Sequence, residues 1–126
     1  MRLSQKNLTP PLETEIRRAL LQIIADVRTT EEADTLLSNL LTETEQLAIA
    51  KRLAIALFLT EGKSYEEIKQ GLKVSSATVA KVQESINKKG IKLAIDKVKA
   101  DRWAGDLAAK ISKNINQLFG GPTSKN

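Results

Sequence analysis

The stretch Ser64–Lys89, SYEEIKQGLKVSSATVAKVQESINKK, decides the fold because it predicts two short helices joined by a tight turn. The first helix is expected over about Tyr65–Leu72. The second is expected to open with Ser75 as its N-cap, since a Ser hydroxyl can accept a hydrogen bond from an amide of the first turn. Its apolar residues then recur at helical spacing, at Val79, Val82 and Ile86. Gly90 is expected to close it as a left-handed cap.

This pattern is typical of a helix-turn-helix, in which the first turn of the second helix meets base edges in the major groove. The residues of that turn are small and allow a close approach, so the expected base contacts are Ser76, Ala77 and Thr78. The expected phosphate contacts are Lys69, Lys73, Ser75 and Lys81, with weaker backbone contacts from Lys88 and Lys89. An ordinary helical hairpin is the alternative that the spacing alone allows.

Two lysines depart from the commonest helix-turn-helix pattern. Lys69 stands where the helices usually cross at a small residue, and Lys73 stands where the turn usually has Gly. A residue other than Gly in a left-handed conformation is strained by about 1 kcal/mol. Either the turn has a different geometry, or these lysines tolerate the strain in exchange for a phosphate contact.

The composition predicts one all-α domain. The chain has 126 residues, of which 41% are apolar and only 3% aromatic, so Leu, Ile, Val and Ala must form its core. It has no Cys and no His, which excludes Cys/His zinc sites, disulfides, and thiol or imidazole catalysis. The sequence also has no phosphate-binding Gly loop and no nucleophile–base pair. We therefore expect no enzyme, no metal site and no cofactor.

The charge is concentrated in the second half of the chain. Residues 1–61 hold 7 Lys and Arg against 9 Asp and Glu, whereas residues 62–126 hold 13 against 6. This surplus favours a polyanion such as double-stranded DNA as partner, although solubility alone could also explain it. The longest apolar run, Leu53–Leu59, is far shorter than the roughly 20 residues that span a bilayer. We expect a soluble cytoplasmic protein of bacterial type that joins the nucleoid when bound, with no membrane partner.

The chain is expected to have three parts. Residues 1–9 form a flexible N-terminal arm, residues 10–103 a helical dimerisation and helix-turn-helix domain with the helix-turn-helix at 64–89, and residues 104–126 a C-terminal helical extension with a flexible tail. Three helices are expected before the helix-turn-helix: Pro10 to about Arg28, Thr30 as N-cap to about Leu41, and Glu43 to Glu61 closed by Gly62. Another helix should follow Gly90 and run to about Trp103.

The third of these helices is apolar on nearly every side. A helix of this kind must be surrounded. A chain this small has few helices to surround it, so a homodimer is favoured over a compact monomer. Lys51 and Arg52 interrupt its apolar run. Each is either an anion contact or, as the more common case, a paired or snorkelling cation at an interface.

Several motifs together resemble the bacterial Trp repressor superfamily. They are L-L-T-x-x-E at 40–45, Arg52, Gly62, S-Y-E-E-I-K-Q-x-L at 64–72, and A-T-V at 77–79. The resemblance covers about residues 36–90 and is stronger to the uncharacterised repressor-like branch than to the tryptophan-responsive protein. It implies an intertwined all-helical homodimer whose two reading heads lie about one DNA turn apart on a near-palindromic operator.

The resemblance also implies a candidate effector pocket between the third helix and the recognition helix, formed by Thr42, Arg52, Lys81 and Ser85. In the family, one Arg from each of these helices holds tryptophan. Arg52 matches the first, but Lys81 stands at the second, and Lys cannot stack or fork as a guanidinium does. Val82 stands where Gly is expected and would crowd the slot. A dimer that needs no ligand, or another small effector, is therefore favoured over tryptophan.

The sequence thus predicts a sequence-specific DNA-binding transcription regulator, a repressor, that reads the major groove with the helix starting at Ser75. Two other functions are consistent with the same residues. A helical protein-interaction adaptor would use this surface for protein and show little salt-sensitive DNA binding. A non-specific architectural DNA-binding protein would bind DNA without sequence preference.

Overall fold

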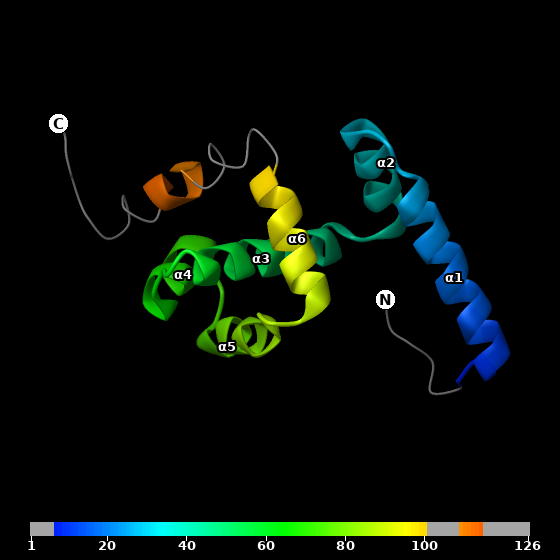
Figure 1. Ribbon diagram of the computed structural model, residues 1–126, viewed down its shortest axis with the longest axis horizontal. Coiled ribbons are helices and arrows are strands. Elements are labelled where there is room, and N and C mark those ends of the chain that lie inside the picture. Colours follow the sequence, from blue (N-terminus) through cyan, green and yellow to red (C-terminus); the bar gives the residue numbers. More distant parts are fainter. Residues whose placement is uncertain (1–6, 101–108, 115–126) are drawn as a thin grey trace. The chain divides into compact units, whose positions relative to one another are not determined.

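The computed structural model describes residues 7–100 and 109–114, and within them the regular structure is entirely helical (Figure 1). The helices are α1 (Pro10–Asp26), α2 (Thr30–Leu40), α3 (Glu43–Thr60), α4 (Tyr65–Leu72), α5 (Ser76–Ser85) and α6 (Lys89–Ala100), with a further helical segment over 109–114. The predicted all-α class is confirmed. The predictions for most of the N-terminal arm, for Trp103 and for the C-terminal tail lie outside the described residues.

The chain divides into two units, Met1–Glu43 and Thr44–Asn126. The first unit contains α1 and α2. Thr9 precedes α1 in an extended conformation, and prolines fill the first helical positions, where a missing N–H costs no hydrogen bond. Neither α1 nor α2 has a buried residue.

The N-cap of α2 differs from the prediction by one residue. The Glu32 amide donates to the Thr29 hydroxyl at 3.0 Å, so Thr29 is the N-cap, and Thr30 is the first helical residue. The prediction of Thr30 was wrong because both threonines are good caps, and only the backbone decides between them. Thr29 has the extended backbone of an N-cap.

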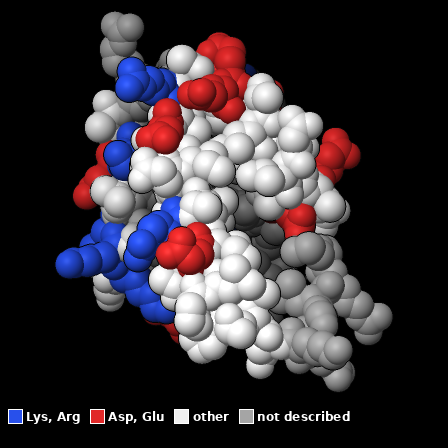
Figure 2. All heavy atoms as spheres, turned by 90° about the vertical axis from the view of Figure 1, so that its right-hand side faces the viewer, with Lys and Arg blue, Asp and Glu red and all other residues white. Residues whose placement is uncertain are grey.

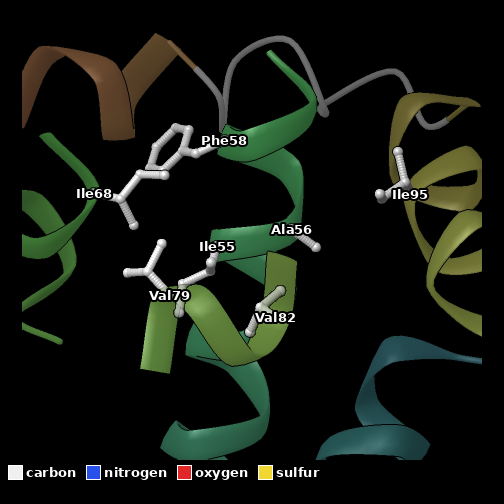
Figure 3. Packing of buried hydrophobic residues seen from close by; sticks show 7 residues of the cluster. All are labelled: Ile55, Ala56, Phe58, Ile68, Val79, Val82 and Ile95. Carbon is white, nitrogen blue, oxygen red and sulfur yellow. The ribbon is translucent and has the colours of Figure 1, made fainter. Parts of the chain in front are cut away.

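The second unit has its core around the C-terminal half of α3. The buried cluster comprises Ile55, Ala56, Phe58, Ile68, Val79, Val82 and Ile95, from α3, α4, α5 and α6. Figure 3 shows the Phe58 ring directed toward Ile68, with Ile55 and Val79 beside them. The predicted stripe of α5 is confirmed, because Val79 and Val82 are buried and Ile86 packs against the cluster. This packing fixes α4 and α5 against α3.

The apolar helix α3 is buried in only one half. Ile55, Ala56, Leu57 and Phe58 are at most 4% exposed. Before this buried run, Leu47 is 56% exposed, Ile49 51% and Leu53 38%. The helices of its own unit therefore cover the second half of α3 and leave the first half apolar and open.

The end of α5 corrects another prediction. α5 ends at Ser85, and its C-cap Ile86 has a right-handed backbone, with φ −60° and ψ −26°. Gly90 is no left-handed cap but lies in the first turn of α6. A short turn, in which the Lys88 amide donates to the Ser85 carbonyl at 2.9 Å, joins the two helices without such a cap. Gly62, after α3, does have the predicted left-handed backbone, with φ 85°.

Candidate nucleic-acid interface

The helix-turn-helix begins with a reciprocal capping box on α4. The Glu67 amide donates to the Ser64 hydroxyl at 3.1 Å, and the Ser64 amide donates to the Glu67 carboxylate at 3.0 Å. The Ser64 amide hydrogen bond holds the pKa of the Glu67 carboxyl below its usual value. This box was not among the predicted caps, although S-x-x-E at 64–67 is its signature.

The turn between α4 and α5 has the left-handed geometry that usually requires Gly. Lys73 is the C-cap of α4, with φ 56° and ψ 55°, and is the one residue other than Gly with positive φ in the described part of the chain. The Lys73 amide donates to the Lys69 carbonyl, and the Val74 amide donates to the same carbonyl at 3.2 Å. The turn therefore has the usual shape, and Lys73 adopts a conformation that is strained for an L-residue.

A lysine of α3 contacts this turn. The Lys51 ammonium donates to the Lys73 carbonyl at 3.2 Å in an exposed hydrogen bond, and Lys51 as a whole residue is half-buried. Lys51 was predicted to be an anion contact or a paired or snorkelling cation at an interface. In the structure its partner is a backbone carbonyl 22 residues further along the chain, which no periodicity or spacing could indicate.

The first turn of α5 is fixed at its base and open at its surface. The Thr78 amide donates to the Ser75 hydroxyl at 3.1 Å, which confirms Ser75 as N-cap. Ser76, Ala77 and Thr78 are all exposed. Val79, the next residue, is fully buried in the core. The helix thus presents a turn of small side chains to solvent from a rigid support.

The predicted phosphate-contacting lysines lie on α4, at its C-cap, on α5 and at the start of α6. Lys73, Lys81, Lys88 and Lys89 are exposed. Lys69 is half-buried, and its ammonium lies 3.6 Å from the Glu66 carboxylate one turn earlier. A hydrogen bond from Gln70 and the charge of Lys69 hold the pKa of the Glu66 carboxyl below its usual value. Lys69 therefore has a carboxylate partner that a phosphate would have to replace.

The four residues of the candidate effector pocket lie on different parts of the chain. Thr42 belongs to the first unit, whereas Arg52, Lys81 and Ser85 belong to the second. Arg52 and Lys81 are exposed, and the Ser85 hydroxyl lies 3.5 Å from the Lys81 carbonyl. Val82 is 4% exposed and belongs to the core cluster.

Two cavities of the second unit are lined by residues other than these four. The first, about 430 Å³, is an apolar groove lined by residues of α3, α4 and α6 and by Ile111. The other, about 370 Å³, lies among residues near the end of α3 and along α6, with Asp96 among its polar residues. Neither cavity brings the predicted effector residues together.

Two further features concern other classes of function. The described residues contain no group of three or more His, Cys, Asp or Glu side chains that could hold a metal ion. Within the same residues, every helix is too short or too polar to span a membrane.

Comparison with known proteins gives one match. The family model described as Trp repressor protein matches residues 16–96, which include α3, α4 and α5. Neither a curated protein nor a solved structure matches the chain.

Proposed function

Because the chain belongs to the Trp repressor family, a family of DNA-binding transcription regulators, we propose that it represses transcription by binding a specific operator sequence in double-stranded DNA. The recognition helix is α5, which enters the major groove with its N-terminal turn. The observation that carries this proposal is the exposed turn Ser76–Thr78, which is followed directly by the buried Val79. Base readout needs side chains that reach the groove from a rigid support.

The side chains of this turn fit the major groove chemically. The hydroxyls of Ser76 and Thr78 can donate to or accept from base edges, and the methyl groups of Ala77 and Thr78 can contact thymine methyls. Phosphate contacts from Lys69, Lys73, Ser75 and Lys81, and more weakly from Lys88 and Lys89, would set the orientation of α5. Lys81 is on α5 itself, so its distance from the base-reading turn is fixed by the helix.

We also propose that the regulator is a homodimer. The apolar side chains of α1 recur on one face and remain exposed, at Leu12, Ile16, Leu20, Ile23 and Ile24. The part of α3 before its buried run adds Leu47, Ile49 and Leu53. Figure 2 shows broad areas without charged side chains on the face that it displays. Apolar surface on this scale favours a protein partner, and a second copy offers the same surface.

The effector is proposed to be absent or different from tryptophan. Val82 fills the space beside α3 as part of the core, whereas a planar ligand between α3 and α5 would need that space. An exposed Lys81 also lacks the planar fork of a guanidinium. Tryptophan binding would therefore require Val82 to move. It would also require the carboxylate of tryptophan to be held by something other than a guanidinium at position 81.

The decisive experiment is selection of bound duplexes from a random DNA library at near-physiological salt, with and without tryptophan. We expect a two-fold symmetric motif with half-sites about 10 bp apart, enriched equally in both conditions. Enrichment only with tryptophan would overturn the proposed effector independence. Binding without an enriched motif would instead support the architectural function. No binding even at low salt would favour the protein-interaction adaptor, for which the exposed apolar surface is also suited.

A further inference from the structure

We propose that Lys51 is a positioning residue of the DNA-binding site, which holds the left-handed turn of the helix-turn-helix in place through its hydrogen bond to the Lys73 carbonyl. This inference rests on the proposed DNA-binding function. Lys51 lies on α3 and affects DNA affinity through Lys73, without contacting DNA itself.

The geometry makes Lys51 a polar link between α3 and the turn, in addition to Val74, which packs against the buried cluster. The Lys51 ammonium lies 3.2 Å from the Lys73 carbonyl oxygen, at the C-terminal end of α4. The negative end of the α4 dipole lies at the same place, so the contact combines a charge-assisted hydrogen bond with a favourable dipole interaction. Lys51 also lines the apolar groove with Leu47 and Leu72.

The turn needs such a link because its conformation is unfavourable for Lys. Lys73 has φ 56° where Gly would be free of steric strain. Relaxation of Lys73 would change the direction in which the chain enters α5, two residues before the N-cap Ser75 and three before the first base-contacting residue. A cation fixed on α3 opposes this relaxation, because α3 carries the core residues against which α5 packs.

Lys51 also lies between the two halves of α3. Leu47, one helical turn before it, is exposed, whereas Ile55, one turn after it, is fully buried. The contact therefore lies close to the boundary between the exposed and the buried part of α3. A direct phosphate contact from Lys51 is the competing explanation, and it predicts a different set of mutant effects.

The test compares Lys51→Met, which keeps the stem and removes the donor, with Lys51→Arg, which keeps a donor. Lys97→Met is the matched control, because Lys97 is an exposed lysine in the last turn of α6 and its loss changes the net charge equally. In the free protein we expect hydrogen exchange of the Lys73 and Val74 amides to accelerate about fivefold in Lys51→Met, equivalent to about 1 kcal/mol. Lys51→Arg and Lys97→Met should exchange like wild type.

A double-mutant cycle then separates positioning from direct DNA contact. Lys51→Met should weaken binding to the selected duplex about fivefold without changing the salt slope. In a Lys73→Gly background, where the turn has no strain to oppose, the same substitution should have little effect on affinity. Lys73→Gly and the double mutant Lys51→Met/Lys73→Gly both lack the Lys73 cation, so its loss cancels when their affinities are compared.

Two results would overturn the proposal. One is unchanged amide exchange in Lys51→Met together with a salt slope smaller by about 0.9, which would make Lys51 a phosphate contact. The other is an equal loss of affinity in the wild-type and Lys73→Gly backgrounds, which would show that the turn does not transmit the effect. A wild-type protein that bound no duplex would overturn the proposed DNA-binding function, whereas the exchange data on the free protein would still decide whether Lys51 holds the turn.

Discussion

Ser75 and Thr78 are joined by two hydrogen bonds at the start of α5. The Thr78 amide donates to the Ser75 hydroxyl at 3.1 Å, and the two hydroxyl oxygens lie 2.9 Å apart. The residue that caps α5 therefore also orients the hydroxyl of a proposed base contact. A hydroxyl has one donor and two acceptor positions, so that of Thr78 keeps the capacity for a hydrogen bond to DNA.

Replacement of the cap should lower stability. We expect Ser75→Ala to reduce the free energy of unfolding by about 1 kcal/mol, because the Thr78 amide loses its acceptor. Urea denaturation followed by circular dichroism measures this change. Ser76→Ala is the matched control, since Ser76 is an exposed Ser inside the same turn, and Ala is the better helix former there. An equal loss in both variants would argue against a capping role for Ser75.

Thr78→Val should change sequence preference more than stability. The amide of residue 78 can still donate to Ser75, so the fold should persist, while the hydroxyl available to a base is lost. We expect the free energy of binding to the selected duplex to fall by about 1–3 kcal/mol. A duplex with a different base at the position read by Thr78 should bind wild type and Thr78→Val alike. Binding measured against a panel of single-base variants tests this, with Thr78→Ser as the control that keeps the hydroxyl. Unchanged affinity and preference in Thr78→Val would remove Thr78 from base readout.

Lys81→Met should weaken DNA binding in a salt-dependent way. If Lys81 neutralises one phosphate, the slope of log affinity against log salt should become shallower by about 0.9, and every duplex sequence should be affected alike. Lys97→Met is the control, because it removes one positive charge at a position outside the proposed interface. Titrations at several salt concentrations measure the slope, and identical slopes for wild type and Lys81→Met would exclude the contact.

The capping box should make α4 sensitive to acid. The pKa of the Glu67 carboxyl is lower in the folded protein than its usual value. Its contribution to stability is therefore present above the unfolded-state pKa, about 4.3, and is lost as the pH falls through the folded-state value. Glu67→Gln should destabilise the protein at pH 7 and much less at acidic pH, where wild-type Glu67 is protonated. Urea denaturation at both pH values measures the difference, and Glu84→Gln, at an exposed position of α5, is the control. A destabilisation that does not depend on pH would contradict this role.

A charge on the apolar face of α1 should prevent dimerisation. Leu20 is 46% exposed and lies in the middle of that face. We expect Leu20→Glu to be monomeric at concentrations at which wild type is dimeric, since burying an unpaired carboxylate in an interface is costly. Sedimentation velocity over a range of concentrations measures the change. Thr14→Glu, at an exposed polar position of α1, should leave the dimer intact. A wild-type protein that is monomeric throughout would contradict the proposed assembly.

The helices α4 and α5 could be predicted from the sequence because their signals are local. The limits of α4 follow the prediction, and Ser75 caps α5 as expected, since a cap and its amide partner lie within three residues of each other. The predictions that failed also rest on local signals, but in each case a second local arrangement was equally possible. Thr29 and Thr30 are both good caps, and the turn before α6 needs no left-handed Gly90.

The sequence by itself determined the all-helical class, the position of the helix-turn-helix and the exposed turn Ser76–Thr78, because helical periodicity and capping depend on neighbours along the chain. The tertiary structure alone decided that Lys51 contacts the Lys73 carbonyl and that α3 is buried only in its second half. It also showed that Lys73 has the left-handed backbone, which excludes a different turn geometry, whereas the phosphate contact stays a prediction. These features depend on residues distant in sequence, and their pairing is fixed only when the helices pack around Phe58 and its neighbours.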